Sequence, residues 1–390
     1  MKVTQHDVPR QTSTPTAVLV VGAGPTGLTL AVGLALRGIK TVVVDKLAEG
    51  VNTSRAAVVH ARTLEVLEPL GVNETLIARG LKARQFSIRD GDKVLMPIAF
   101  GALPTAYPYT LMVSQAVTEK VLLDRFKELG GTVLRPRALV NLDQDATGVT
   151  ATLDDGSRLR ASYVVGADGM HSTVRAKARI PFSGGSYGES FVLADVRMSG
   201  GVPDNEVALY FSSAGMAVSA PLPDGVHRIV ATVDDAPEHP SADYVEALLR
   251  ERGPQHDPAH VHEVLWGARF RVHHRIADTY RVGRVLLAGD AAHVHSPAGG
   301  QGMNVGILDA ALLADALDKA LSGTVHALDA YGARRRPIAQ QVVALADRLT
   351  RLATVRPALR SWRNLLLSTL SRLPPIRRRL AWQLSGLIYR

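Results

Sequence analysis

The sequence predicts an α/β fold in which a parallel sheet flanked by helices is interrupted by a β-sheet-rich domain and followed by C-terminal helices. Continuous apolar runs within 17–21 and 41–46 are typical of parallel strands buried on both faces. Residues 186–275 instead form short β-rich pieces separated by Gly, Pro and Asp, which indicates an inserted sheet. The buried-strand pattern returns at "GRVLLAGD" (283–290), and the chain then ends in helices.

The first elements form a strand–helix–strand unit. "AVLVV" (17–21) leads into a helix predicted from Pro25 to Arg37, with Pro25 in its first turn and Gly38 as its C-cap. "TVVVDK" (41–46) is the second strand. Two more helices are predicted over 60–71 and 114–131. The alternating pattern over 148–169 predicts a hairpin that turns at Asp154-Asp155-Gly156 and leads into the buried strand "SYVVGADG".

Composition excludes several classes of protein. The 390 residues contain no cysteine, so disulfides, thiolate metal sites, redox dithiols and cysteine-linked cofactors are excluded. The net charge of +9 arises in the tail, because residues 351–390 hold nine arginines and no acidic residue. The rest of the chain has 36 basic and 36 acidic residues, which argues against nucleic-acid binding. No apolar run is long enough to span a membrane, and we expect a cytoplasmic protein.

The segment "VVGAGPTG" carries glycines at 22, 24 and 27 in the spacing G-x-G-x-x-G. Such glycines allow a tight turn, a close approach of the backbone to a pyrophosphate, and close helix–strand packing. Asp45 ends the next strand, where a carboxylate can accept hydrogen bonds from ribose hydroxyls. The unit therefore predicts dinucleotide binding without separating NAD from FAD. A glycine turn without a ligand and a surface position for Asp45 are the alternatives.

Two further motifs, "VVGADGMHSTVR" (164–175) and "LLAGDAAHVHSPAGGQGMN" (286–304), follow in order. The second joins a buried strand to a long helix through a loop with one carboxylate and several glycines. Together with the glycine fingerprint they resemble the FAD-dependent aromatic hydroxylases of the para-hydroxybenzoate hydroxylase type, the group A flavin monooxygenases, over residues 17–345. The resemblance implies a Rossmann-like FAD-binding domain, non-covalent FAD, and NAD(P)H as the co-substrate.

The resemblance also implies roles for individual residues. The ADP half of FAD would be held by Gly22, Gly24, Gly27, Asp45 and Lys46, with Arg55 near the pyrophosphate. Gln115 would lie along the flavin, while Asp168, Gly169 and Arg175 belong to an element implicated in binding both FAD and NAD(P)H. Ribityl and ring contacts would come from Gly289, Asp290, Pro297, Gly299, Gly300, Gly302, Met303 and Asn304. Asp168 before Gly169 is also compatible with a simple turn.

Two residues are candidates for a catalytic role. Pro297 is placed by the resemblance beside the reactive ring face, and Arg228 matches a substrate-domain arginine by strand pattern alone. No metal site is expected, because His293 and His295 have no supporting set of ligands. We expect these two histidines to pack beside the flavin or to face solvent, and His273 and His274 to lie at a domain interface.

The implied domains are discontinuous in sequence. Residues 1–14 would be a flexible tail, 15–90, 111–180 and 276–345 the FAD-binding domain, 91–110 and 181–275 the substrate-binding domain, and 346–390 basic helices. The tail helices, broken at Pro374-Pro375, are expected to pack on the body or on a partner subunit with their arginines solvated, and membrane contact is the less favoured alternative. A homodimer is compatible with the sequence.

The implied reaction inserts one oxygen atom of O2 into an aromatic molecule through a C4a-hydroperoxyflavin. The mixed apolar and polar inserted domain favours a phenolic or polyketide-like substrate over a simple benzoate. Baeyer–Villiger oxidation, epoxidation and dehydrogenation on the same scaffold stay open, as does a non-catalytic flavin-binding partner protein. A flavin halogenase is disfavoured because its paired-tryptophan motif is missing, and two-dinucleotide disulfide reductases are excluded by the lack of cysteine.

Overall fold

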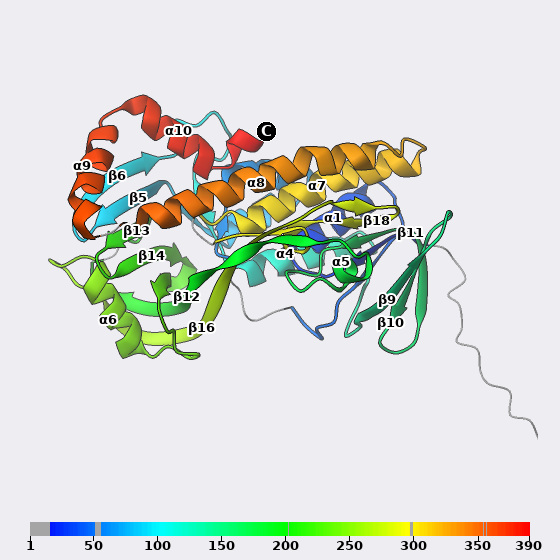
Figure 1. Cartoon of the computed structure of the whole chain (residues 1–390), viewed down its shortest axis with the longest axis horizontal. Helices are drawn as coiled ribbons and strands as arrows, with labels where there is room; N and C mark the ends of the chain where they lie inside the picture. The colour runs from blue at the N-terminus through cyan, green and yellow to red at the C-terminus, as the bar shows by residue number, and fades with distance from the viewer. Residues whose placement is uncertain (1–15, 51–55, 202, 297–298, 354, 356) are drawn as a thin grey trace, which may run out of the picture.

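The computed structural model describes residues 16–50, 56–201, 203–296, 299–353, 355 and 357–390. Its first sheet contains a mostly parallel path in the order β17-β18-β11-β1-β2-β8, to which the hairpin β9–β10 is attached through β11 (Figure 1). The strands are β1 (Thr16–Val21), β2 (Thr41–Val44), β8 (Val133–Leu134), β9 (Leu139–Gln144), β10 (Val149–Leu153), β11 (Arg158–Gly166), β17 (Arg281–Val282) and β18 (Val285–Leu287). The apolar centre of β1 is fully buried, as the continuous apolar run predicts.

Helices cover this sheet closely because small residues line their contacts. Helix α1 (Pro25–Leu36) packs against α4 (Gln115–Glu128) and α7 (Gly302–Leu321). A Cβ added at Gly33 of α1 would lie 3.1 Å from the Cβ of Ala314 on α7, so the two helices approach at the limit of contact. Helix α8 (Ala327–Ala353) runs beside α7 along the top of the molecule (Figure 1). The predicted helices at 25–37 and 114–131 are confirmed to within a few residues.

The second sheet has the strand order β19-β16-β12-β15-β14-β13-β5-β6. Its strands are β5 (Gln85–Asp90), β6 (Lys93–Ala99), β12 (Phe182–Ser199), β13 (Glu206–Ser212), β14 (Gly215–Leu222), β15 (Val226–Val233), β16 (His260–Ala277) and β19 (His293–Val294). The separate β-rich domain is confirmed, and most of its strand pairs are antiparallel. Strand β5 belongs to this sheet, although the domain division from sequence placed 85–90 in the first domain.

Two long antiparallel strands connect the sheets. β12 and β16 pair along most of their length, from Phe182 opposite Ala277 to Ser199 opposite His260. The end of β16 nearer the first sheet also pairs with β19, which follows the "GDAAH" segment. The loop of the third sequence motif is therefore held directly by a strand of the second sheet.

The remaining elements close the molecule. Helix α6 (Ala242–Arg252) covers one face of the second sheet, and α9 (Arg360–Leu370) and α10 (Pro374–Leu384) pack on the other face beside β5 and β6 (Figure 1). The break at Pro374-Pro375 is confirmed, whereas the boundary expected at 345 falls inside α8. The other elements are β3 (Val58–Val59), β4 (Leu81–Ala83), β7 (Thr110–Met112), α2 (Ala61–Leu67), α3 (Asn73–Ala78) and α5 (Thr173–Lys177). No helix in the described ranges has the length and hydropathy of a membrane span.

A buried charge network joins α7, α8 and β19. The Asp309 carboxylate accepts hydrogen bonds from Arg335 Nε at 2.5 Å and from the Gly289 amide at 3.1 Å, and its Oδ2 lies 2.6 Å from His293 Nε2. Asp309 is fully buried, and burial alone would raise the pKa of its carboxyl. Arg335 and His293 outweigh that effect and hold the pKa of Asp309 below its ordinary value.

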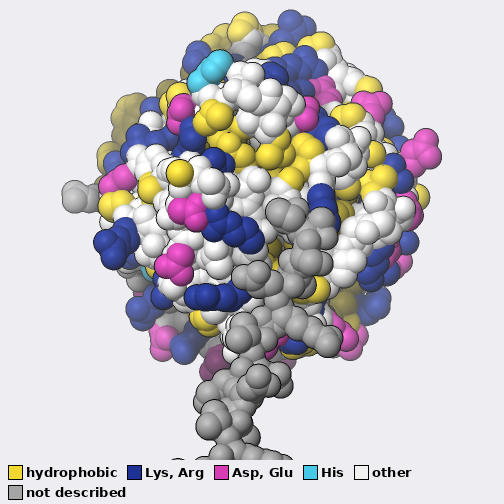
Figure 2. Space-filling view, turned by 90° about the vertical axis from the view of Figure 1, so that its right-hand side faces the viewer, with side chains coloured by type: hydrophobic (Ala, Val, Ile, Leu, Met, Phe, Trp, Pro, Cys, Tyr) yellow, Lys and Arg dark blue, Asp and Glu magenta, His cyan; other side chains and the backbone are white. Residues whose placement is uncertain are grey.

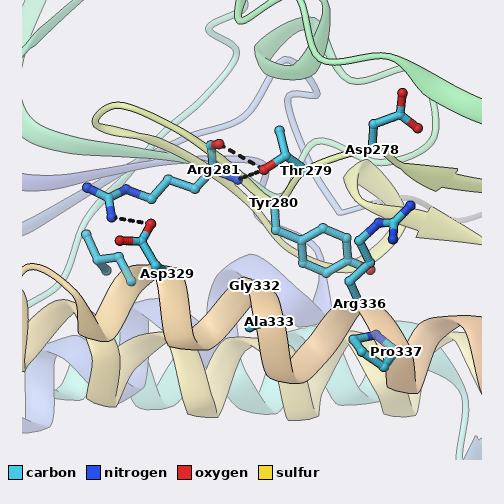
Figure 3. A pocket seen from close by; sticks show the side chains of 10 residues that line it. Asp278, Thr279, Tyr280, Arg281, Asp329, Gly332, Ala333, Arg336 and Pro337 are labelled. Carbon is cyan, nitrogen blue, oxygen red and sulfur yellow. Dashed lines mark hydrogen bonds and ion pairs between the residues drawn. The ribbon is translucent and has the colours of Figure 1, made fainter.

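Aromatic rings surround this network. The ring of Tyr280 stacks on His293 at a centroid distance of 6.2 Å, and the Tyr331 hydroxyl donates to the Leu287 carbonyl at 2.9 Å. Tyr280 also borders a cavity of about 310 Å³ between the β16–β17 connection and α8, near Arg336 (Figure 3). None of the residues that line this cavity belongs to the three motifs.

Replacing Asp309 by Asn should destabilise the fold strongly. The substitution leaves Arg335 buried without its carboxylate, and breaking a buried pair in this way costs about 3–5 kcal/mol. Urea unfolding followed by circular dichroism measures the loss. Asp315→Asn on the same helix is the matched control, because its exposed ion pair with Arg37 contributes at most about 1 kcal/mol. Equal losses in the two variants would contradict a structural role for Asp309.

Candidate active site

The glycine fingerprint forms a turn packed against the second motif. Gly22 has φ +106°, and a Cβ there would stand 2.2 Å from the Ala167 carbonyl oxygen. A Cβ at Gly27 would stand 1.9 Å from the Gly22 carbonyl oxygen, so both positions require glycine. Gly24 is the N-cap of α1. Among the residues that the structure describes, no side chain caps this helix end and none would contact a Cβ at Gly24. The first turn of α1 therefore offers amides and a positive dipole end to an anion.

Asp45 lies beside this turn, as its place at the end of β2 predicts. Its carboxylate accepts the Ala23 amide at 2.7 Å and the Leu47 amide at 2.8 Å. Lys46 follows it and is exposed. Arg135, which sequence reasoning missed, reaches the same place from the end of β8: its Nη2 is 3.3 Å from the Ala23 carbonyl oxygen and 3.9 Å from Asp45 Oδ2.

Glu119 of α4 is a further carboxylate near Asp45 and Arg135, and it was not predicted from the sequence. Glu119 is buried, accepts a hydrogen bond from Gln115 Nε2 at 2.8 Å, and has a raised pKa because of its burial. Gln115 Oε1 also receives the Ala56 amide at 3.4 Å. Gln115 therefore connects α4 to the segment before β3.

The carboxylate of the second motif organises its own loop. Asp168 accepts the Ser172 hydroxyl at 2.5 Å and the amides of Thr173 and Val174 at 2.7 and 3.1 Å, so it caps helix α5. Burial raises the pKa of Asp168 against the effect of these hydrogen bonds. Gly169 has φ +79° and open space around it. Within the protein, Asp168 therefore acts as a turn residue that bonds the start of α5, as one of the two interpretations of the sequence predicts.

Arg175 fastens the second motif to the third. Its Nη2 donates to the Met170 carbonyl at 2.8 Å and its Nη1 to the Ala291 carbonyl at 2.9 Å, while the guanidinium lies 3.8 Å from the Phe182 ring centroid. The planar guanidinium can serve both carbonyls and the ring at once. Arg175 therefore fixes the distance between the "GADG" and "GDAAH" loops.

The third motif also touches the fingerprint helix directly. A Cβ added at Gly289 or Gly306 would lie 2.6 or 2.4 Å from Thr26 Oγ1, so Thr26 sits between the loop and α7. Asp290, the next residue, is exposed on the short 3-10 turn Gly289–Ala291. The three motifs, separated by more than a hundred residues each, thus meet at one edge of the first sheet.

The glycine-rich turn before α7 is held by Asn304 and His60. Asn304 accepts the His60 amide at 2.8 Å and donates to the carbonyls of Val58 and Gly300 at 2.9 and 2.8 Å. His60 Nε2 lies 3.0 Å from the Gly299 carbonyl oxygen and must carry a proton to bond there. Gly302 is the first residue of α7, and Met303 packs on the core.

Two buried histidines beside this turn are uncharged near neutral pH. Burial lowers the pKa of His60 to about 4 and that of His295 to about 4. His295 Nδ1 lies 2.8 Å from its neighbour's carbonyl, and its ring faces Gly302. His293, expected beside the flavin or in solvent, is instead buried against Asp309. The solvent-facing alternative for His293 was wrong, because the sequence pattern could not show that a carboxylate on α7 binds this side chain.

Arg228 is almost fully buried in β15 and binds Asp195 of β12 bidentately, with both N–O distances at 2.7 Å. Alternation along β15 puts Arg228 on the same sheet face as Val226 and Val230. Val226 packs in a cluster with Ala57 of the segment before β3, and Val230 in the cluster that includes Leu384. This face therefore looks toward the glycine-rich turn.

The structure brings most predicted positions together, with exceptions. Arg55 and Pro297 lie outside the described residues, as does the 1–14 tail. His273 and His274 lie on β16 where it pairs with β12 near the first sheet. No cluster of three metal-ligating side chains occurs among the described residues. One signal for Asp309 was available: a lone carboxylate in the apolar run "VGILDAALL" needs a buried partner. The sequence gives no comparable signal for His60 or Arg135.

Comparison with known proteins agrees with the resemblance of the three motifs to FAD-dependent hydroxylases. The family model described as "FAD binding domain" matches residues 15–346. Rifampicin monooxygenase of Streptomyces venezuelae is 37% identical over 357 residues, which are 90% of this chain and 74% of that protein. The 12-dehydrotetracycline 5-monooxygenase/anhydrotetracycline 6-monooxygenase of Streptomyces rimosus is 36% identical over 391 residues, with 95% and 76% covered.

Solved structures agree over the whole fold. The p-nitrophenol 4-monooxygenase of Pseudomonas putida superposes with a TM-score of 0.86 at 26% identity, covering 95% of this chain and 97% of that one. Anhydrotetracycline hydroxylase of Streptomyces rimosus gives a TM-score of 0.81 at 37% identity, with 96% and 76% covered. The chain therefore belongs to the FAD-binding monooxygenase family, and it is a flavin-dependent aromatic hydroxylase that uses NAD(P)H.

Proposed function

We propose that this hydroxylase acts on a polycyclic phenolic or polyketide-like molecule bound between the second sheet and the glycine-rich turn before α7. The observation that carries the proposal is a buried guanidinium, Arg228, which is paired with Asp195 on a largely apolar sheet face that looks toward this turn. An extended aromatic substrate needs such apolar area for its rings and a polar contact to set its orientation.

The residues of the three motifs fit FAD. The uncapped end of α1 suits the pyrophosphate. Gly22 and Gly27 allow the close backbone packing of the turn, and the space beside Gly24 would admit a phosphate group. Asp45 would bind the ribose with its remaining acceptor positions, and exposed Asp290 would accept from the ribityl hydroxyls. The turn from Gly299 to Asn304 would carry the ring on backbone amides. Bound FAD supplies the acceptance of electrons from NAD(P)H and the activation of O2.

The chain itself would bind and orient the substrate and exclude water. The apolar face is built from β12, β13, β15 and β16 with α9 and α10, and its members include Phe191, Leu209, Phe211, Phe270 and Leu384. Leu384 lies near the glycine turn, since a Cβ at Gly299 would be 3.6 Å from its side chain. This apolar enclosure would keep water from the reacting atoms.

Arg228 would hold one oxygen of the substrate. Two nitrogens of its guanidinium bind Asp195, while Nη1 is buried and has no hydrogen-bond partner among the described residues. A buried donor without a partner is costly, and a phenolate or carbonyl oxygen would satisfy it. The names of the relatives support multi-ring substrates, since two of them act on rifampicin and anhydrotetracycline.

The purified protein should bind FAD and oxidise NADPH or NADH faster when a polycyclic phenol is added. Stopped-flow absorbance at the flavin band with anhydrotetracycline, rifampicin and p-nitrophenol as probes measures the effect, and mass spectrometry detects a product heavier by one oxygen. Faster flavin reduction with p-nitrophenol than with either polycyclic probe would reject the proposed substrate class while leaving the enzyme class intact.

Arg228→Lys should weaken substrate binding without releasing FAD. Lysine keeps the charge but cannot bind Asp195 with two nitrogens and the substrate with a third. We expect KM for the accepted probe to rise by about tenfold or more, the effect of losing one charge-assisted hydrogen bond of about 1.5–3 kcal/mol. FAD content by absorbance should stay unchanged. Arg197→Lys on the exposed part of β12 is the control, and matching KM values for the two variants would refute this role.

Stability should fall as pH drops below neutral, partly because of His60. The unfolded histidine binds a proton below its ordinary pKa of 6.5, whereas folded His60 stays neutral down to about pH 4. The unfolded state therefore binds more protons in this window, and His60 contributes stability that is full above pH 6.5 and is lost toward pH 4. The slope is about 1.4 kcal/mol per pH unit.

Urea unfolding from pH 7 to pH 5 of wild type and His60→Gln measures this contribution. The variant keeps a donor for Gly299 but cannot titrate, so its stability should depend less steeply on pH by about one proton. His239→Gln, at an exposed position, should keep the wild-type slope. A parallel pH dependence of wild type and His60→Gln would show that His60 is not the titrating group.

A further inference from the structure

The outer side of α9 carries the most exposed large hydrophobic side chains in the described chain. Trp362 is 71% exposed, Leu365 58% and Leu366 55%, and the flanking Leu359 and Leu373 are 53% and 48% exposed. The other exposed large hydrophobic side chains of the described ranges reach at most 44% and are scattered over several elements. We call these five residues the α9 apolar surface. Such a cluster is typical of an interaction surface, whereas isolated exposed leucines are ordinary.

The surroundings of the α9 apolar surface are basic. Residues 351–390 include nine arginines and no acidic residue, and Arg372, Arg378 and Arg379 are exposed on or near α10. At the opposite end of the molecule, basic and acidic side chains are interspersed (Figure 2). Within 351–390 the apolar side chains are accompanied by arginines and by no carboxylate, while Asp90 of neighbouring β5 accepts a hydrogen bond from Asn364 of α9. The apolar and basic side chains thus gather on the C-terminal helices.

The inner side of α9 is fixed to the body, so the outer side cannot turn inward. Leu367 packs in the apolar cluster of the second sheet, and Arg363 Nη2 donates to the Phe211 carbonyl at 3.1 Å. Arg360 Nη2 donates to the Ser213 carbonyl at 2.8 Å. The helix lies at the outer edge of the molecule beside β5 and β6 (Figure 1). The α9 apolar surface is thus held toward the outside by contacts on the opposite side of the same helix.

We propose that the α9 apolar surface and its arginine rim dock this enzyme on an anionic lipid surface. Leucine and tryptophan side chains suit the boundary between acyl chains and headgroups, and arginines suit anionic headgroups. Charge complementarity favours lipid over a second copy of the chain, because two copies would bring like-charged rims together. The sequence favoured packing on the body, and the inner side of α9 does so; the orientation of its outer side became visible only in the structure.

The same helices also border the proposed substrate surface. Leu367 of α9 and Leu384 of α10 belong to one apolar cluster with Phe191 and Phe211, and Leu384 approaches the glycine turn at Gly299. A lipid-bound enzyme would therefore have its apolar substrate cluster next to the membrane-facing helices. The docking proposal rests on the outer side of α9 and holds independently of which aromatic molecule is oxidised.

Co-sedimentation of the full-length holoprotein with vesicles tests the proposal. Vesicles of phosphatidylcholine with roughly one-third phosphatidylglycerol should bind the protein, and pure phosphatidylcholine should bind it at least about tenfold more weakly. Binding should weaken at about 0.5 M salt, where surface charges are screened. On binding, tryptophan emission should shift to the blue, and Trp362→Phe should lose most of that shift because Trp362 is the most exposed of these side chains.

The double variant Trp362→Ser/Leu366→Ser should lose vesicle binding by about tenfold or more, since two apolar side chains no longer enter the lipid. The control Val140→Ser/Val325→Ser changes two exposed residues on β9 and between α7 and α8, at the opposite end of the molecule, and should bind as wild type. Flavin absorbance and thermal melting report whether each variant is folded.

Equal binding to the two vesicle types, or equal loss in both double variants, would overturn the proposal. Analytical ultracentrifugation separates the alternative of self-association. If the wild type forms a dimer that the Trp362→Ser/Leu366→Ser variant loses, and neither binds vesicles, the α9 apolar surface belongs to a second copy of the chain.

Discussion

The buried carboxylate of Asp309 is the interaction on which the position of the third motif depends. It lies on α7 and binds Arg335 of α8, His293 before the turn, and the amide of Gly289 in the loop itself. Two helices and one loop that are apart in sequence therefore share a single negative charge. A buried charge must be compensated by its partners. If one of these segments moved away, Asp309 would lose a partner and the folded state would be strongly destabilised. The loop that we propose to contact the flavin is thus held in place by α7 and α8.

Direct contacts then join the loop to the other two motifs. Thr26 fills the space between Gly289 and Gly306, and Arg175 connects the carbonyls of Met170 and Ala291. These contacts join backbone atoms of one motif to side chains of another, so they restrain the relative positions of the three motifs. A cofactor that touches all three motifs needs such a rigid arrangement, because its ring and its phosphates are held by different parts of the chain.

Buried polar side chains around the glycine turn and on the second sheet are likewise either uncharged or paired with an opposite charge. His60 and His295 are buried and therefore neutral near pH 7, so each adds hydrogen-bonding capacity to the turn without adding charge. Arg228, in contrast, is a buried guanidinium that binds the Asp195 carboxylate with two nitrogens. A turn held by neutral histidines and one paired guanidinium on a largely apolar face fit the proposed site, which must exclude water yet orient an aromatic ring.

The sequence alone determined the fold class, the first βαβ unit and the three motifs with their order. Each of these is written in local signals: apolar runs, glycine spacing, and a carboxylate at a strand end. It did not determine the partners of the buried charges. Asp309 and Arg335, Arg228 and Asp195, and Arg135 and Ala23 are 26 or more residues apart along the chain and meet only when α8, β12 and β8 take their places.

The tertiary structure also decided which side of helix α9 faces the body and which side is exposed. The sequence predicted two basic C-terminal helices, but apolar residues occur on more than one side of them. Only the packing of these helices shows which side is covered. Arg363 and Leu367 contact the body on one side of α9, and Trp362 on the other side is exposed. A residue's type and spacing fix what it can do chemically, whereas its burial and its distant neighbours fix which charge state, contacts and surface it has in the folded protein.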